Sequence, residues 1–125
     1  MTEILFKHEV YQVIGAALDV YYHLGPGFAE PVYQEALQME LTRRRIPFTP
    51  QCPTHVFYKG EPLECFYKPD FVCFDEVVAE IKALHSLGGR DHAQILNYLR
   101  ATDKRVGLLI NFGSAIRLEW KRFVV

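Results

Sequence analysis

An acid and a base two residues apart, Glu80 and Lys82, lie in the mostly apolar run of residues 77–83. Alternate side chains of an extended strand share a face, so Glu80 and Lys82 are expected to point the same way. The pattern alone is weak, because the chain carries a second Glu-x-Lys at Glu119 and Lys121. Without a further partner the pair indicates a solvated strand face whose salt bridges contribute about 0–1 kcal/mol each.

The preceding segment supplies a candidate partner, Asp70. Pro69 has no N–H to give to a sheet, so a bulge or bend is expected there, and bulges re-aim neighbouring side chains. A two-residue loop pairing Phe74 with Val77 would put Asp70 and Glu80 on different faces of the hairpin. A three-residue loop, or a bulge at Pro69, would give them a common face. We expect one of these two arrangements, and carboxylates on opposite faces would contradict a catalytic role.

Two carboxylates on one face can hold a hard divalent cation such as Mg²⁺, which prefers oxygen ligands and leaves positions for water and phosphate. Such an ion activates water and neutralises charge during an in-line displacement. Lys82, two residues from Glu80, is placed to orient the water or to stabilise developing negative charge. The set of Asp70, Glu80 and Lys82 therefore predicts hydrolysis of phosphodiester bonds.

Helical spacing marks three segments that would position these residues. The first has its apolar stripe at Val10, Val13, Ile14, Ala17, Leu18 and Tyr21, and residues 25–27, Gly-Pro-Gly, end it. A second helix is expected from Glu30-Pro31 to the arginines at 43–45, which suit the negative end of a helix dipole. A third is expected over residues 90–102, with His92, Ile95, Leu96 and Leu99 inward.

Strand-like segments fill most of the remaining chain. Residues 54–58, 62–74 and 77–83 predict three antiparallel strands, and 106–111 predicts a buried strand returning after a crossover helix. Ile116, Leu118 and Trp120 alternate with polar residues and predict a final edge strand. The order ααβββαββ indicates an α/β fold with a mixed central sheet flanked by helices.

Length and composition suit one globular domain over residues 1–125, with a net charge of −1 that identifies no partner. The N-terminus lacks the unbroken apolar stretch of a signal peptide, and no segment is long enough to cross a bilayer. Three cysteines without Cys-x-x-Cys spacing favour a reduced, cytoplasmic protein over a structural zinc site.

Pro69-Asp70 followed by Glu80-Ile81-Lys82 resembles the PD-(D/E)xK motif of a nuclease superfamily with an αβββαβ core. Residues 27–33 read Gly-x-x-Glu-x-x-Tyr, similar to the signature of the prokaryotic GxxExxY family of predicted nucleases. Residues 94–98 are similar to the Gln-x-x-x-Tyr motif of RecB-like exonucleases, and residues 108–113, LLINFG, resemble the penultimate strand of the family. The fold implied is this core with an extra N-terminal helix and a C-terminal edge strand.

The resemblance also implies roles for individual residues. Asp70 and Glu80 would bind Mg²⁺ or Mn²⁺, with Glu30 as a further acid near the metal, and Lys82 would be the catalytic lysine. Gln94 and Tyr98 would line the substrate side, and Tyr33 would support the site. The implied substrate is DNA or RNA.

Other interpretations of the same residues stay open. Glu30 is also a common type of acid at a helix N-terminus, and Tyr33 is equally well a core aromatic residue. The whole chain is alternatively a non-catalytic nucleic-acid-binding or protein-interaction module on the same fold. In the protein-interaction case the edge strand at 116–121 would pair with another chain or with a second copy. A homodimer would separately help a nuclease of this size to span both strands of a duplex.

Overall fold

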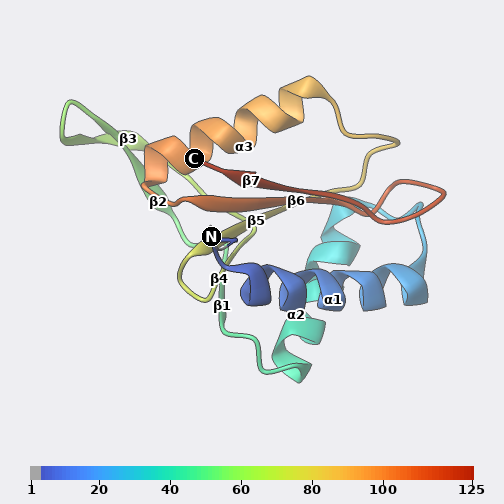
Figure 1. Ribbon diagram of the computed structural model, residues 1–125. Helices are drawn as coiled ribbons and strands as arrows, with labels where there is room; N and C mark the ends of the chain where they lie inside the picture. Colours follow the sequence, from blue (N-terminus) through green and yellow to red (C-terminus); the bar gives the residue numbers. More distant parts are fainter. Residues whose placement is uncertain (1–3) are drawn as a thin grey trace.

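A five-stranded mixed sheet is covered by two helices on one face and by one helix on the other (Figure 1). The computed structural model describes residues 4–125. The helices are α1 (Lys7–Leu24), α2 (Glu30–Arg43) and α3 (Gly89–Thr102). The sheet has the order β1 (Phe48–Pro50), β4 (Phe71–Cys73), β5 (Val77–Lys82), β6 (Val106–Asn111) and β7 (Glu119–Val124). The strands β2 (Thr54–Tyr58) and β3 (Glu61–Tyr67) form a separate two-stranded sheet.

The three helices and the buried strand β6 confirm the predictions made from the periodicity of the sequence. The apolar stripe of α1 is buried, and Gly25 ends this helix with a φ of 71°. The helix α2 begins at Glu30, with Pro31 in its first turn. The strand β6 is buried at all of its residues, because it lies parallel to β5 in the middle of the sheet after the crossover helix α3.

The strand expected over residues 62–74 is in fact two strands in two different sheets. Lys68, Pro69 and Asp70 separate β3, which pairs with β2, from β4, which pairs with β1 and β5. A proline cannot donate to a ladder, so the break at Pro69 ends one sheet rather than bulging a continuous strand. The short edge strand β1 was not expected.

The final edge strand also differs from the prediction, because it begins at Glu119 rather than at Ile116. Ile116 is 91% exposed in the loop that joins β6 to β7. The register that pairs Asn111 with Glu119 leaves residues 112–118 outside the ladder. The position of β7 at the edge of the sheet agrees with the prediction.

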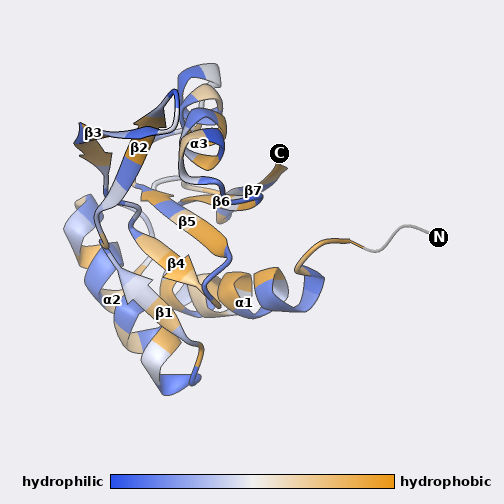
Figure 2. Ribbon diagram, turned by 90° about the vertical axis from the view of Figure 1, so that its left-hand side faces the viewer, coloured by the Kyte–Doolittle hydropathy of each residue, from blue (hydrophilic) through white to orange (hydrophobic). Residues whose placement is uncertain are grey.

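Two apolar cores lie on the two faces of the sheet. The larger packs α1 and α2 against the side chains of Phe71, Ala79 and Ile81, and the smaller packs α3 against Val78 and Leu109. Figure 2 shows the hydrophobic colouring of β4 and β5 between the amphipathic helices. Alternation along β5 therefore places Glu80 and Lys82 on the face covered by α3.

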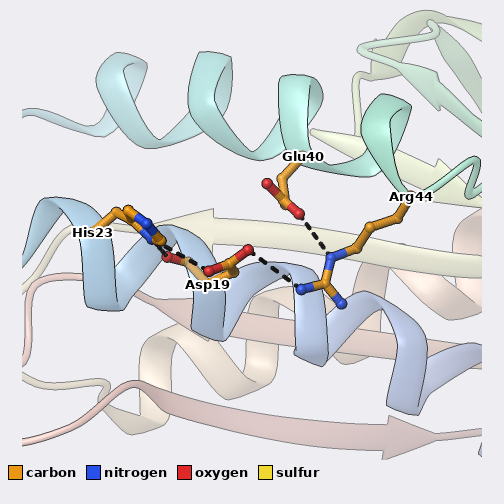
Figure 3. A network of polar contacts seen from close by, with 4 residues as sticks. All are labelled: Asp19, His23, Glu40 and Arg44. Atoms are coloured by element: carbon orange, nitrogen blue, oxygen red, sulfur yellow. Dashed lines mark hydrogen bonds and ion pairs between the residues drawn. The ribbon is translucent and has the colours of Figure 1, made fainter.

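Ion pairs of Arg44 connect the end of α2 to α1 (Figure 3). The guanidinium of Arg44 lies 2.8 Å from Oε2 of Glu40 and 3.4 Å from Oδ2 of Asp19. The other oxygen of Asp19, Oδ1, lies 3.2 Å from Nδ1 of His23. Arg44 follows the last turn of α2, so its charge also suits the helix dipole, as expected for this arginine cluster. These ion pairs thus lie at the end of α2 opposite to Glu30.

None of the helices within residues 4–125 combines the length and the apolar character needed to cross a bilayer.

Candidate active site

The β4–β5 hairpin brings Asp70 and Glu80 together on one face. Its loop has three residues, 74–76, because Cys73 pairs with Val77, and this is one of the two arrangements expected from the sequence. Phe74 and Asp75 close the loop with positive φ angles of 56° and 60°. The pairing puts Asp70 next to Glu80, so the two carboxylates share a face, and their catalytic role stays a prediction.

Backbone hydrogen bonds hold both carboxylates in place. The N–H of Asp70 donates to Oε1 of Glu80 at 3.1 Å, and the N–H of Ile81 donates to Oδ2 of Asp70 at 2.8 Å. Each acid thus accepts a hydrogen bond from the backbone beside the other. Among residues 4–125, the backbone and Tyr67 donors reach one oxygen of each carboxylate.

Tyr67, which was not predicted as a site residue, completes the environment of Glu80. Its hydroxyl donates a short hydrogen bond to Oε1 of Glu80. The ring of Tyr67 is buried and stacks on the ring of Tyr98 with centroids 3.6 Å apart. Burial and the nearby charge of Glu80 raise the pKa of Tyr67, so its hydroxyl stays a neutral donor.

Gln94 and Tyr98 therefore reach the carboxylates through Tyr67. The side-chain nitrogen of Gln94 donates to the hydroxyl of Tyr98 at 2.7 Å, which orients the ring that covers Tyr67. Gln94 is itself exposed beside Lys82. The Gln-x-x-x-Tyr spacing on α3 thus places one side chain at the solvent edge and one over the buried tyrosine.

Burial and mutual repulsion make the two carboxylates hard to ionise together. Burial first, and then the charge of Asp70, raise the pKa of Glu80 to about 8. Burial also raises the pKa of Asp70, although the N–H of Ile81, the Glu80 side chain and the charge of Lys82 oppose this. A pair of this kind shares one proton near neutral pH.

Glu30 lies at the rim of the pair rather than within it. It is exposed at the first position of α2. Partial burial and the charge of Asp70 raise the pKa of Glu30, whereas Lys82 lowers it, so the three side chains act on one another electrostatically. Within the described part of the chain, no three His, Cys, Asp or Glu side chains form a ready metal-binding group.

Lys82 lies beside Glu80 with a free ammonium group. It lines a hollow of about 480 Å³ together with Glu30, Arg90 and Gln94. Among residues 4–125, its ammonium has no carboxylate partner within 4.0 Å. Two cations, Lys82 and Arg90, thus border a space next to the carboxylates.

Tyr33 lies in the core and not at the carboxylates. Its ring is fully buried and stacks on Phe112 at 4.8 Å. Its hydroxyl donates to the carbonyl of Gly25 at 2.6 Å and accepts from the N–H of Phe28 at 3.2 Å. Gly27 in the same loop has a φ of 113°, which suits glycine. The Gly-x-x-Glu-x-x-Tyr segment therefore forms the loop that places Glu30 at the start of α2.

Asn111 is a further residue that the sequence interpretation missed. It is fully buried, and its side chain accepts from the N–H of Leu84 at 2.8 Å and donates to the carbonyl of Leu84 at 2.9 Å. It also donates to Glu119, which in turn accepts from the N–H of Leu87. Glu119, the Glu of the second Glu-x-Lys, thus fixes the chain that follows Lys82.

The chain matches, over residues 7–123, the family model described as PD-(D/E)XK nuclease superfamily. The matched range contains Glu30, Asp70, Glu80 and Lys82. No curated protein and no solved structure gives a significant match to the chain. The narrower likeness to the GxxExxY family and to RecB-like exonucleases stays a prediction.

Proposed function

Because the chain belongs to the PD-(D/E)XK nuclease superfamily, we propose that it is a Mg²⁺- or Mn²⁺-dependent nuclease that hydrolyses phosphodiester bonds of DNA or RNA. The observation that carries this proposal is the Asp70–Glu80 pair, fixed on one sheet face beside the ammonium of Lys82, which has no carboxylate partner among the described residues.

The donor set suits a hard cation. Both ligands would be carboxylate oxygens, and Mg²⁺ commonly uses one or two carboxylates with water and phosphate in its remaining positions. Burial raises the pKa of both Asp70 and Glu80, and the charge of Asp70 raises that of Glu80 further. A divalent cation is the charge that would stabilise both groups as carboxylates. Glu30 is proposed as the third acid near this ion.

When bound, the cation supplies a Lewis acid that activates water and neutralises charge on the phosphoryl group. The protein supplies the rest from fixed positions. Tyr67 and the N–H of Asp70 hold one oxygen of Glu80, and the N–H of Ile81 holds one oxygen of Asp70. The ammonium of Lys82 orients the attacking water or stabilises the negative charge that develops on phosphate.

A second candidate function is nucleic-acid binding without cleavage, or interaction with another protein. The β2–β3 hairpin favours it, because Phe57, Tyr58 and Phe66 are more than half exposed there. The ammonium groups of Lys59 and Lys68 lie over two of these rings, at 5.4 and 5.7 Å from the centroids. Aromatic rings beside lysines are typical of surfaces on which unpaired bases stack.

Two further parts of the proposal concern partners and location. The outer edge of β7 has no strand partner among residues 4–125, and pairing of two such edges would form a homodimer. Cys52, Cys65 and Cys73 are unpaired thiols, which suits the reducing cytoplasm.

Metal binding tests the proposed function directly. We expect calorimetry to show binding of Mn²⁺ or Mg²⁺ to the wild type, and loss of binding in both Asp70→Ala and Glu80→Ala. The matched control Glu64→Ala, at an exposed position of β3, should bind like the wild type. Lys82→Met should keep the metal and lose cleavage of oligonucleotides by about 10²–10³-fold, the size typical of one electrostatic stabiliser.

Two results would count against the nuclease. Absence of metal binding in the wild type, even with an oligonucleotide present, would contradict it. Oligonucleotide binding that is salt-dependent but unaffected by EDTA and without cleavage would favour the binding module instead.

A further inference from the structure

Two hollows meet at Glu30, and they differ in chemistry. The first, described above, is bordered by two cations, Lys82 and Arg90, and by two acids, Glu30 and Asp91. The second has about 520 Å³ and lies between α2 and the segment after β1. We call it the amide-lined hollow, and its walls include Glu30, Gln34, Glu35, Gln38, Met39 and Gln51. It ends at Asp70.

The walls of the amide-lined hollow disfavour phosphate. None of its lining residues within the described chain is Lys or Arg, and three carboxylates border it. A phosphodiester there would meet like charge without compensation. The space therefore suits a neutral group, whereas in the other hollow Lys82 and Arg90 balance the charges of Glu30 and Asp91 and offer cations to a phosphate.

The same walls suit a flat, hydrogen-bonding group. Three glutamine amides present donors and acceptors together, and amide side chains pair with the edges of nucleobases. Met39 adds a polarizable apolar surface that is 58% exposed. The volume lies in the range of sites for small ligands.

Hydrogen bonds connect this hollow to the carboxylate pair. The side chain of Gln34 donates to the carbonyl of Asp70 at 3.3 Å, and the N–H of Gln51 donates to the same carbonyl at 3.2 Å. A group held between these walls would thus adjoin the residue that we propose as a metal ligand. The hollow is therefore placed to receive the nucleotide next to the bond that is cut.

We propose that the amide-lined hollow binds one unpaired nucleobase of the substrate strand. The inference rests on the proposed function for its substrate class, and it adds a preference. Bases in a duplex already use their pairing edges, so a single strand, or a nucleotide turned out of a helix, fits the hollow and an intact duplex does not.

Binding in EDTA tests this inference without turnover. The probes are a labelled single-stranded oligonucleotide and an oligonucleotide of equal length in which every nucleotide is abasic, so that both carry the same phosphates. The variant is Gln38→Ala with Met39→Ala, two exposed positions whose truncation leaves the core intact, and circular dichroism checks its fold. Gln12→Ala on the exposed face of α1 is the matched control.

We expect the wild type to bind the strand with bases about tenfold more tightly than the abasic strand, as measured by fluorescence anisotropy. The double variant should lose most of this preference and keep its affinity for the abasic strand. The control should retain the full preference.

Two kinds of result would overturn the inference. An unchanged preference in the double variant would place the base contacts elsewhere, and Phe66→Ala would then test the β2–β3 hairpin as that place. Equal binding of both strands, or no binding, would exclude a base site. Cleavage by a wild type without base preference would leave the nuclease intact, whereas base preference without metal binding would contradict the nuclease alone.

Discussion

Ionisation of Glu80 should weaken the metal-free protein as the pH rises. In the unfolded chain this carboxyl has the ordinary pKa of 4.5, and in the folded protein its pKa is about 8. Between these values the folded state binds more protons than the unfolded state, so the free energy of unfolding falls with increasing pH. The difference between the two pKa values corresponds to a loss of about 5 kcal/mol in the free energy of unfolding between pH 4.5 and about 8. At higher pH this group causes no further loss.

Glu80→Gln should remove this dependence, because the amide keeps the shape of the side chain and an oxygen for Tyr67 and the N–H of Asp70. The assay is urea unfolding in EDTA from about pH 5 to about pH 8. Glu64→Gln, at an exposed position, is the control and should follow the wild type. The raised pKa values of Asp70 and Glu30 act in the same direction and leave a smaller slope in the variant.

A bound divalent cation should offset part of this pH-dependent loss of stability. It prefers the ionised pair, so Mn²⁺ or Mg²⁺ at 100 times its dissociation constant should add about 2.7 kcal/mol at the alkaline end of the series. Glu80→Gln should gain less. Wild type and Glu80→Gln with slopes that differ by less than about 1 kcal/mol across the window, the effect of an ordinary substitution, would refute the assignment of a shared proton to this pair.

Two predictions concern the supports of the site. Gly113→Ala should destabilise the fold by about 1–3 kcal/mol, because its Cβ would lie 2.6 Å from the backbone nitrogen of Leu84. Gly89→Ala, where a Cβ meets no atom within 4 Å, should be neutral or slightly stabilising in the same urea titration. Tyr33→Phe should lower the free energy of unfolding by about 1–2 kcal/mol, because the carbonyl of Gly25 loses its donor. Stability equal to the wild type in thermal unfolding would show that this hydroxyl is dispensable.

The parts of the fold that repeat a local pattern could be predicted from the sequence. The stripe of α1, the proline at the start of α2 and the apolar run of β6 each depend on near neighbours in the chain. The common face of Asp70 and Glu80 was also accessible, because a strand period of two makes loop length decide the face.

The supports of the site could not be predicted, because each depends on a partner far along the chain. Tyr67 is one of several aromatic residues in its segment, and only the pairing of β4 with β5 shows that it meets Glu80. Asn111 resembles a turn residue at the end of a strand, yet it bonds to Leu84, which is 27 positions away. The amide of Gln34 reaches Asp70 across 36 positions. No periodicity encodes such contacts.

The break at Pro69 explains why the hairpin and the carboxylates form one unit. Tyr67 is the last residue of β3, and Asp70 directly precedes β4, so three residues connect the hairpin to the central sheet. Tyr67 and the N–H of Asp70 both donate to Oε1 of Glu80. Both donors therefore lie at the short connection between the hairpin and the central sheet. If β3 continued into β4 without this bend, Tyr67 and Asp70 would point to opposite faces of one strand, because they are three residues apart. They could not then both donate to the same oxygen of Glu80.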